Sequence, residues 1–149
     1  LGDSLTVGSQ KNLRNRLRGV VIDAEIGRQM EVFATKSVVK PLSDGKTTNL
    51  VVALGTNGVV DENQLDETLA LYSDLARIVL VNNAGDKPWI EKNNAVFKRL
   101  ADKYENVKVG DWKSIVESKP SLIGSDGIHP TKRGSVEFSR LIIAELSKP

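Results

Sequence analysis

Runs of consecutive valine, isoleucine and leucine alternate along this 149-residue chain with segments in which apolar residues recur at helical spacing. The apolar runs predict strands at 20–26, 49–54, 77–81 and 107–109. Strands that are apolar on both faces are typical of a sheet that is covered on both sides. Strands that alternate with helices form right-handed βαβ units, so we expect a single α/β domain with a parallel sheet between two helical layers.

Three helices are predicted between and after these strands, at 61–74, 90–104 and 131–147. Asp61 and Gln64 have the spacing of a capping box at the start of the first helix. The segment 84–88 has ordinary turn chemistry. The last helix carries one apolar stripe, which is expected to bury Val136, Phe138, Leu141, Ile142 and Leu146.

The composition excludes several classes of protein. The formal net charge is +2 and only 5% of the residues are aromatic, which argues against a dedicated nucleic-acid-binding domain. The chain has no cysteine, so it forms neither disulfides nor thiolate metal sites. No apolar stretch approaches membrane-spanning length, and no segment has the pattern of a signal peptide. The basic run Lys11, Arg14, Arg16 and Arg18 is interpreted as the solvated face of a helix.

His129 is the only histidine of the chain and follows three residues after Asp126. Near the other end of the chain, Ser4 follows Gly2 and Asp3. A serine hydroxyl is a weak nucleophile near neutral pH and needs a base beside it. We therefore expect a catalytic triad in which Ser4 attacks an acyl carbonyl, His129 takes the serine proton and Asp126 orients the imidazole.

Glycine and polar residues follow the predicted strands at the ends where the sites of parallel sheets form. Gly27 follows the first predicted strand, and Gly55, Thr56 and Asn57 follow the second. An acyl-transfer site also needs hydrogen-bond donors aimed at the developing oxyanion. The candidate donors are the backbone N–H groups of Ser4 and Gly27 and the side-chain amide of Asn57.

Each of these motifs also has an ordinary structural interpretation. The motifs at 2–4 and 55–57 are common turns when taken alone, and Asp126 alone is equally suited to capping the last helix. Their combination in this order, each at a predicted strand end or helix start, favours catalysis. Ser4 should follow a central strand of such a sheet, and only Leu1 of that strand is present. We therefore expect that further residues precede Leu1 in the natural protein.

The ordered set of motifs resembles that of the SGNH hydrolases, also called GDSL esterases. The resemblance implies a flavodoxin-like three-layer fold with strand order 2-1-3-4-5. It also implies an acyl transfer by serine, histidine and aspartate that uses no metal and no cofactor. The matching blocks are Gly2-Asp3-Ser4, Gly27, Gly55-Thr56-Asn57 and Asp126-Gly127-Ile128-His129.

A narrower similarity is to the extracellular C-terminal domain of peptidoglycan O-acetyltransferases. Many hydrolases of the wider family have aspartate at the position of Gly58. The similarity implies that a small donor acetylates Ser4, which passes the acetyl group to the C6 hydroxyl of N-acetylmuramic acid. It also implies one catalytic domain over 1–149 that follows an integral-membrane acyltransferase at the extracellular face of the cell membrane. The similar stretches are Ile26-Gly27-Arg28-Gln29, Leu54-Gly55-Thr56-Asn57-Gly58 and Lys87-Pro88-Trp89.

Arg28, Gln29 and Trp89 are the candidate walls of the acceptor cleft, although core packing explains Trp89 equally well. Two other functions stay open. One is a cytosolic or secreted carbohydrate or lipid esterase that uses water as acceptor, and the other is a non-catalytic glycan-binding module. A nucleotide-binding function is not supported, since no glycine-rich phosphate-binding motif follows a strand. The isolated domain is expected to be a monomer without a nucleic-acid partner.

Overall fold

The structure is a computed structural model that describes residues 1–35 and 46–148. Three parallel strands are hydrogen-bonded in the order β1-β2-β3. Leu50 of β1 lies opposite Ile78 of β2, and Leu80 of β2 lies opposite Val109 of β3. The strands predicted at 49–54, 77–81 and 107–109 are therefore confirmed, with bounds β1 (Asn49–Val52), β2 (Arg77–Val81) and β3 (Val107–Gly110).

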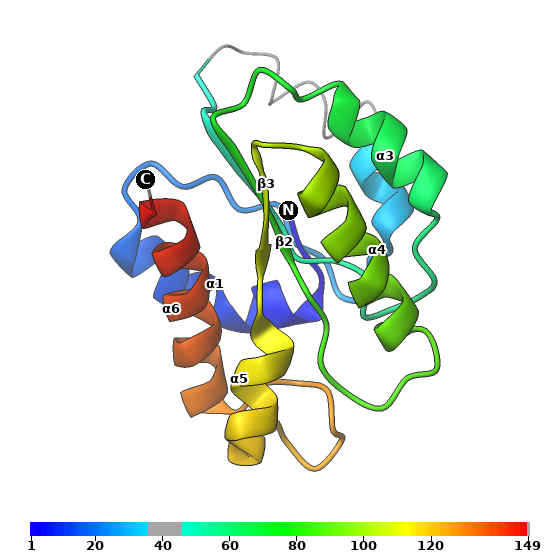
Figure 1. Cartoon of the computed structure of the whole chain (residues 1–149). Coiled ribbons are helices and arrows are strands. Elements are labelled where there is room, and N and C mark those ends of the chain that lie inside the picture. The colour runs from blue at the N-terminus through cyan, green and yellow to red at the C-terminus, as the bar shows by residue number, and fades with distance from the viewer. Residues whose placement is uncertain (36–45, 149) are drawn as a thin grey trace.

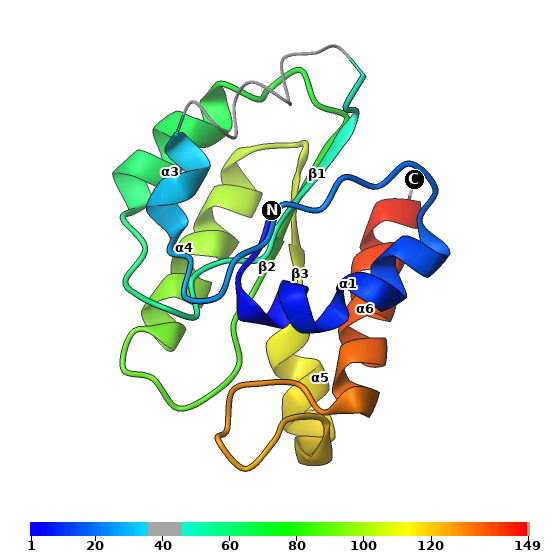
Figure 2. The same ribbon diagram turned by 180° about the vertical axis from the view of Figure 1, so that it is seen from behind.

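Helices cover both faces of this sheet (Figure 1). One face carries α3 (Glu62–Ala70), α4 (Ile90–Lys103) and the short 3-10 helix η1 (Met30–Ala34). The opposite face carries α1 (Ser4–Arg16), α5 (Trp112–Ser118) and α6 (Lys132–Ser147), as the view from behind also shows (Figure 2). A second 3-10 helix, η2 (Pro120–Leu122), leads from α5 toward α6. The predicted three-layer α/β architecture is thus confirmed.

The middle strand explains why the apolar runs are continuous. Ile78 and Leu80 belong to the buried cluster under α3 and α4, whereas Val79 and Val81 belong to the cluster under α1, α5 and α6. Successive side chains of a strand point to opposite faces, so a strand between two helical layers must be apolar at every position. Both faces of β2 are fully covered in this way.

Leu1 and Gly2 pair with the edge of β1 that faces away from β2. The amine of Leu1 donates to the carbonyl of Val51, and the N–H of Ala53 donates to the carbonyl of Leu1, both at 2.9 Å. On the other side, Gly2 forms a parallel bridge with Ala24. The segments therefore cross the sheet in the order Ala24, Gly2, β1, β2, β3, which corresponds to the implied strand order 2-1-3-4-5.

The strand predicted at 20–26 is wrong except at Ala24, where the single bridge to Gly2 forms. A strand persists only where a neighbouring strand pairs with its backbone N–H and C=O groups. Beside residues 20–22 the structure has instead a groove of about 760 Å³, which separates them from β1. Val21, in the middle of this apolar run, is 84% exposed.

Side chains cap the helices where the sequence pattern places their starts. Asp61 accepts a hydrogen bond from the backbone N–H of Gln64 at 3.0 Å. Thr131 accepts one from the backbone N–H of Gly134 at 3.1 Å. Each bond satisfies an N–H that the first helical turn leaves without a partner, so these polar residues fix where the helix begins.

One predicted helix needs correction, and apolar periodicity missed two other helices. The helix predicted at 61–74 ends at Ala70, because the next N–H groups donate to carbonyls three residues back and tighten the chain into turns. Apolar periodicity did not predict α1 and α5. Helix α1 is mostly polar, with Leu5 and Leu13 as its buried apolar residues, and α5 spans only seven residues. The predicted helix at 90–104 is confirmed as α4.

Candidate active site

Ser4, His129 and Asp126 form one continuous chain of hydrogen-bonding groups. The hydroxyl oxygen of Ser4 lies 3.0 Å from Nε2 of His129. The other ring nitrogen, Nδ1, lies 2.7 Å from Oδ2 of Asp126. Ser4 and His129 are 125 positions apart, and they meet because the start of α1 and the loop before α6 lie next to each other. The structure thus brings together the three side chains that the sequence suggests as a triad.

The loop at 124–129 holds Asp126 in its ionised form. Oδ1 of Asp126 accepts hydrogen bonds from the backbone N–H groups of Ile128 and His129, at 2.9 Å each. The hydrogen bonds from the Ile128 backbone, the His129 ring and the His129 backbone lower the pKa of Asp126 to about 2. The cap of α6 is Thr131, so the alternative of Asp126 as the cap of that helix is wrong.

Ser4 is the first residue of α1, and the buried Asp3 caps this helix. Oδ1 of Asp3 accepts a hydrogen bond from the backbone N–H of Leu5 at 3.0 Å. Burial raises the pKa of the Asp3 carboxyl. Backbone N–H groups in the first turn of a helix have no partner within it, so the N–H of Ser4 is placed as a free donor at the nucleophile itself.

Asn57 reaches the same region from the loop after β1. Its Nδ2 lies 3.1 Å from the carbonyl oxygen of Arg28 and 3.4 Å from Oδ2 of Asp3. The first distance is that of an ordinary hydrogen bond, and the second is at the long end of the range. The hydrogen bond to the Arg28 carbonyl therefore fixes the amide group of Asn57, whereas the second amide hydrogen makes only a weak hydrogen bond to Asp3.

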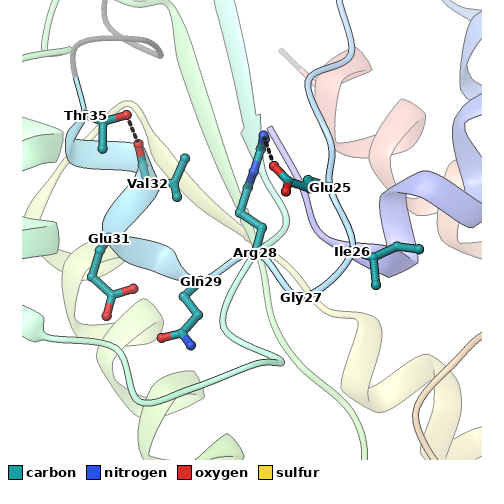
Figure 3. Close-up of a pocket in the computed structure, with 8 residues that line it drawn as sticks. All are labelled: Glu25, Ile26, Gly27, Arg28, Gln29, Glu31, Val32 and Thr35. Carbon is teal, nitrogen blue, oxygen red and sulfur yellow. Dashed lines mark hydrogen bonds and ion pairs between the residues drawn. The ribbon is translucent and has the colours of Figure 1, made fainter.

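Gly27 lines a pocket of about 530 Å³, together with residues of η1 and of the segment before it (Figure 3). Its φ of +78° favours glycine, and nothing lies within 4 Å of the place that a Cβ would take. Gln29 and Glu31 extend to one side of the backbone here, whereas Arg28 turns to the other side, toward Glu25 (Figure 3). The open face of Gly27 leaves its backbone accessible to a bound molecule.

The guanidinium of Arg28 is engaged within the chain. Its Nη1 lies 2.8 Å from Oδ1 of Asp23, its Nη2 lies 3.5 Å from Glu25, and the side chain is only 10% exposed. A long, nearly buried cation of this kind is held by its partners and does not extend into solvent. Arg28 therefore contributes to the site through its backbone carbonyl, which accepts a hydrogen bond from Asn57. Its charged guanidinium points away from the site, toward Asp23 and Glu25.

Trp89 and Gln29 border the loop at 55–58 from two sides. The half-buried Trp89 donates its indole N–H to the carbonyl of Thr56 at 3.2 Å. A Cβ on Gly58 would lie 3.1 Å from the side-chain oxygen of Gln29. Glycine instead of aspartate at position 58 thus leaves room for Gln29 to lie against this loop.

Asn93 is a buried residue of α4 that the sequence analysis missed. Its side-chain amide donates to the carbonyls of Gly55 and Gly58, at 2.9 Å each, and so fixes the shape of the loop that carries Asn57. A signal was present in the sequence. Asn93 lies three and four positions before Val96 and Phe97, on the apolar face of α4, where a buried amide must find partners.

Two kinds of feature are absent from the part of the chain that the structure describes. Within residues 1–35 and 46–148, no three acidic or histidine side chains are grouped closely enough to hold a metal ion. The helices of these same residues are too short or too polar to cross a bilayer.

The fold is that of the SGNH hydrolases. The C-terminal catalytic domain of Streptococcus pneumoniae peptidoglycan O-acetyltransferase A, solved with a methylsulfonyl adduct, matches with a TM-score of 0.82 at 21% identity over 97% of this chain and 89% of that one. A member of the lipolytic G-D-S-L family from Veillonella parvula matches with a TM-score of 0.74 at 16% identity over 99% of this chain and 96% of that one. The implied flavodoxin-like SGNH architecture is thus confirmed.

Sequence relatives of the chain carry the name O-acetyltransferase. The chain is 32% identical over 145 residues to O-acetyltransferase OatA of Staphylococcus aureus, covering 96% of this chain and 24% of the relative. It is 28% identical over 148 residues to peptidoglycan O-acetyltransferase OatA of Listeria monocytogenes, covering 99% of this chain and 24% of that protein. No protein-family model matches the chain. The chain spans about a quarter of the length of these relatives, and the resemblance inferred from its motifs is confirmed.

Proposed function

We propose that this chain is the catalytic domain of a peptidoglycan O-acetyltransferase that works through an acetyl-Ser4 intermediate. The observation that carries the proposal is the 3.0 Å contact between Ser4 Oγ and His129 Nε2, continued at 2.7 Å to Asp126. In the first half of the reaction Ser4 Oγ attacks the acetyl carbonyl of the donor, while Nε2 of His129 takes the hydroxyl proton. The same proton passes to the leaving group, and an acetyl ester on Ser4 remains.

In the second half the acceptor is the C6 hydroxyl of N-acetylmuramic acid. Nε2 of His129 takes the proton of this hydroxyl, its oxygen attacks the ester, and Ser4 Oγ leaves with the proton returned by His129. Ser4 N–H, Gly27 N–H and the weakly held amide hydrogen of Asn57 stabilise the oxyanion in both halves. Positioning of the sugar hydroxyl favours it over water. Gln29 and Trp89 border the Asn57 loop and are the proposed acceptor contacts, whereas Arg28 contributes its carbonyl.

The proposed setting is the one that the resemblance to peptidoglycan O-acetyltransferases implies. We place the domain at the extracellular face of the cell membrane, joined to an integral-membrane acyltransferase, with glycan strands as acceptor and a small acetyl donor. The isolated domain is proposed to act as a monomer and without nucleic acid.

A hydrolase that uses water as acceptor is the second candidate. It is favoured by the openness of the site, since the side chains of His129 and Asp126 are 53% and 52% exposed. Water reaches an acetyl-serine easily in such a site, unless the acceptor covers it. A glycan-binding module without catalysis is the third candidate, and the hydrogen-bonded contact between Ser4 and His129 argues against it.

The deciding experiment supplies p-nitrophenyl acetate as donor and a chitooligosaccharide as acceptor. Mass spectrometry quantifies acetylated oligosaccharide, and released acetate is measured in the same reactions. A transferase produces acetylated sugar that rises with acceptor concentration while free acetate falls. Acetate alone at saturating acceptor would identify an esterase, and no turnover by the wild type would favour a binding module.

Asn57→Ala is expected to lower kcat for aryl acetate by about 10²–10³-fold, because one oxyanion donor contributes about 3 kcal/mol to transition-state stabilisation. KM should change little, since the donor acts mainly on the transition state. Steady-state kinetics on purified variants measure both constants. Asn106→Ala is the matched control. Its amide bonds two backbone carbonyls, of Tyr72 and Leu75, remote from Ser4, so its loss should lower Tm and leave kcat unchanged. Equal kcat in Asn57→Ala and wild type would remove Asn57 from the oxyanion hole.

A further inference from the structure

Gly85 lies in the loop between β2 and α4, against the loop that carries Asp126 and His129. Its φ is +127°, a conformation that residues with a side chain rarely adopt. A Cβ at this position would lie 2.4 Å from Cδ1 of Ile128 and 2.7 Å from the backbone oxygen of Gly127. Both distances are far below van der Waals contact. The two loops approach this closely only because residue 85 has no side chain.

The loop touched by Gly85 has little freedom to move away. Ile128 is buried and packs into the apolar cluster under α1, α5 and α6, together with Ala84 and Leu122. The ends of the loop are tied by a 2.8 Å hydrogen bond from the N–H of Gly124 to the carbonyl of His129. A side chain at position 85 therefore has to displace the backbone at 127–128.

A displacement of the backbone at 127–128 would move Asp126 and His129 together. Ile128 and His129 are consecutive, and the backbone N–H groups of both hold Oδ1 of Asp126 at 2.9 Å. The ring of His129 in turn reaches Ser4 over a single contact of 3.0 Å. A shift of Ile128 alters this last distance, on which proton transfer depends.

We infer that Gly85 is a positioning residue of the acetyl-transfer reaction: it seats the loop at 124–129 so that His129 stays within hydrogen-bonding distance of Ser4. The inference rests on the proposed function for its catalytic consequence. The structural part of the inference, that residue 85 determines the position of the His129 ring, does not depend on the proposed function. It is tested separately by NMR of the ring.

The test compares Gly85→Ala with Gly19→Ala. Gly19 also has a positive φ, of +70°, but nothing lies within 4 Å of its Cβ position, so this control adds backbone strain without a clash. Gly85→Ala is expected to lower kcat for p-nitrophenyl acetate by about 10–100-fold with KM nearly unchanged, as expected for a misplaced catalytic group. Gly19→Ala should keep the wild-type kcat. Rates are measured well below the Tm of each variant.

Two further measurements separate positioning from a general loss of stability. Ile128→Val lacks the Cδ1 atom at 2.4 Å, so the double variant Gly85→Ala/Ile128→Val should recover several-fold of the lost kcat. His129 is the only histidine, so its ring protons give an unambiguous NMR signal at fixed pH. The chemical shift of these ring protons should differ from wild type in Gly85→Ala and match wild type in Gly19→Ala.

The outcomes distinguish the two proposals. A wild-type kcat in Gly85→Ala, or a loss that follows the unfolded fraction with the ring signal unmoved, would overturn the role of Gly85. If the wild type itself shows no Ser4-dependent turnover, the proposed function fails. The ring signal of Gly85→Ala then still decides whether residue 85 places His129.

Discussion

Ser4→Ala is expected to lower kcat/KM for activated acetyl esters by about 10⁴–10⁶-fold, the largest effect of any single substitution in this chain. The hydroxyl of Ser4 is the only group that the proposed cycle acylates, and alanine leaves His129 without a proton to accept. The oxyanion donors survive the substitution, so a small residual rate above that of water should remain.

A sulfonyl fluoride provides an independent measurement of the same prediction. Mass spectrometry of the treated wild type should locate one sulfonyl adduct on the peptide that contains Ser4, and Ser4→Ala should carry none. Ser9→Ala is the matched control. Ser9 lies in the same helix, is fully buried, and has no hydrogen-bond partner among the described residues, so its loss should leave turnover and labelling unchanged. Turnover of Ser4→Ala within tenfold of wild type, or an adduct on another residue, would contradict the assignment of the nucleophile.

Asp126→Asn is expected to lower kcat by about 10²–10⁴-fold. Asparagine retains an oxygen that can accept the two backbone hydrogen bonds from Ile128 and His129, so the loop should keep its shape. It lacks the negative charge that stabilises the imidazolium, and its NH2 group favours the wrong tautomer of the ring. The largest losses of kcat in this range are expected for buried triads. Asp126 is half-exposed, so solvent screens its charge and we expect a loss near the middle of the range.

The pH dependence follows from the pKa of Asp126, which is lowered to about 2. A carboxyl with a depressed pKa makes its contribution above the ordinary value and loses it only as the pH falls through the depressed one. Asp126 therefore stays ionised between about pH 4 and pH 9, so its protonation contributes nothing to any change of wild-type activity in this range.

Steady-state rates across this pH range test the expected loss in Asp126→Asn and the ionised state of Asp126. Asp126→Asn should be slow at every pH, without recovery at either end. Asp102→Asn is the control, because Asp102 is an exposed residue of α4 whose ion pair with Lys98 lies on the surface, and it should match the wild type. A rate for Asp126→Asn within threefold of wild type would show that His129 needs no carboxylate partner.

The chemistry of the candidate site was accessible from the sequence because few residues qualify for each role. A chain with one histidine and no cysteine leaves little choice of general base, and Asp126 is close enough in sequence to reach its ring. The carboxylate–imidazole contact is thus a local feature of four residues. The contact of the ring with Ser4 is not local, and it required the ordered set of motifs to be inferred.

The supporting residues of the site could not be predicted in this way. The carbonyl of Arg28 holds Asn57, yet every residue has a carbonyl, so no residue type signals this role. The guanidinium of Arg28 suggested a ligand contact, whereas its partners Asp23 and Glu25 become visible only in three dimensions. Gly85 looked like an ordinary turn glycine, since the crowding that requires it comes from Ile128, more than forty positions away.

The sequence by itself determined the layers of this protein and the chemical types at its site. Apolar runs at 49–54, 77–81 and 107–109 need cover on both faces, and this requirement follows from side-chain alternation alone. The tertiary structure decided what depends on neighbours. Residues 20–26 have the composition of a strand but pair only at Ala24, because backbone hydrogen bonds require a partner strand that composition does not supply. The alignment of Ser4 with His129 likewise depends on packing between distant loops, where a single methyl group at position 85 would not fit.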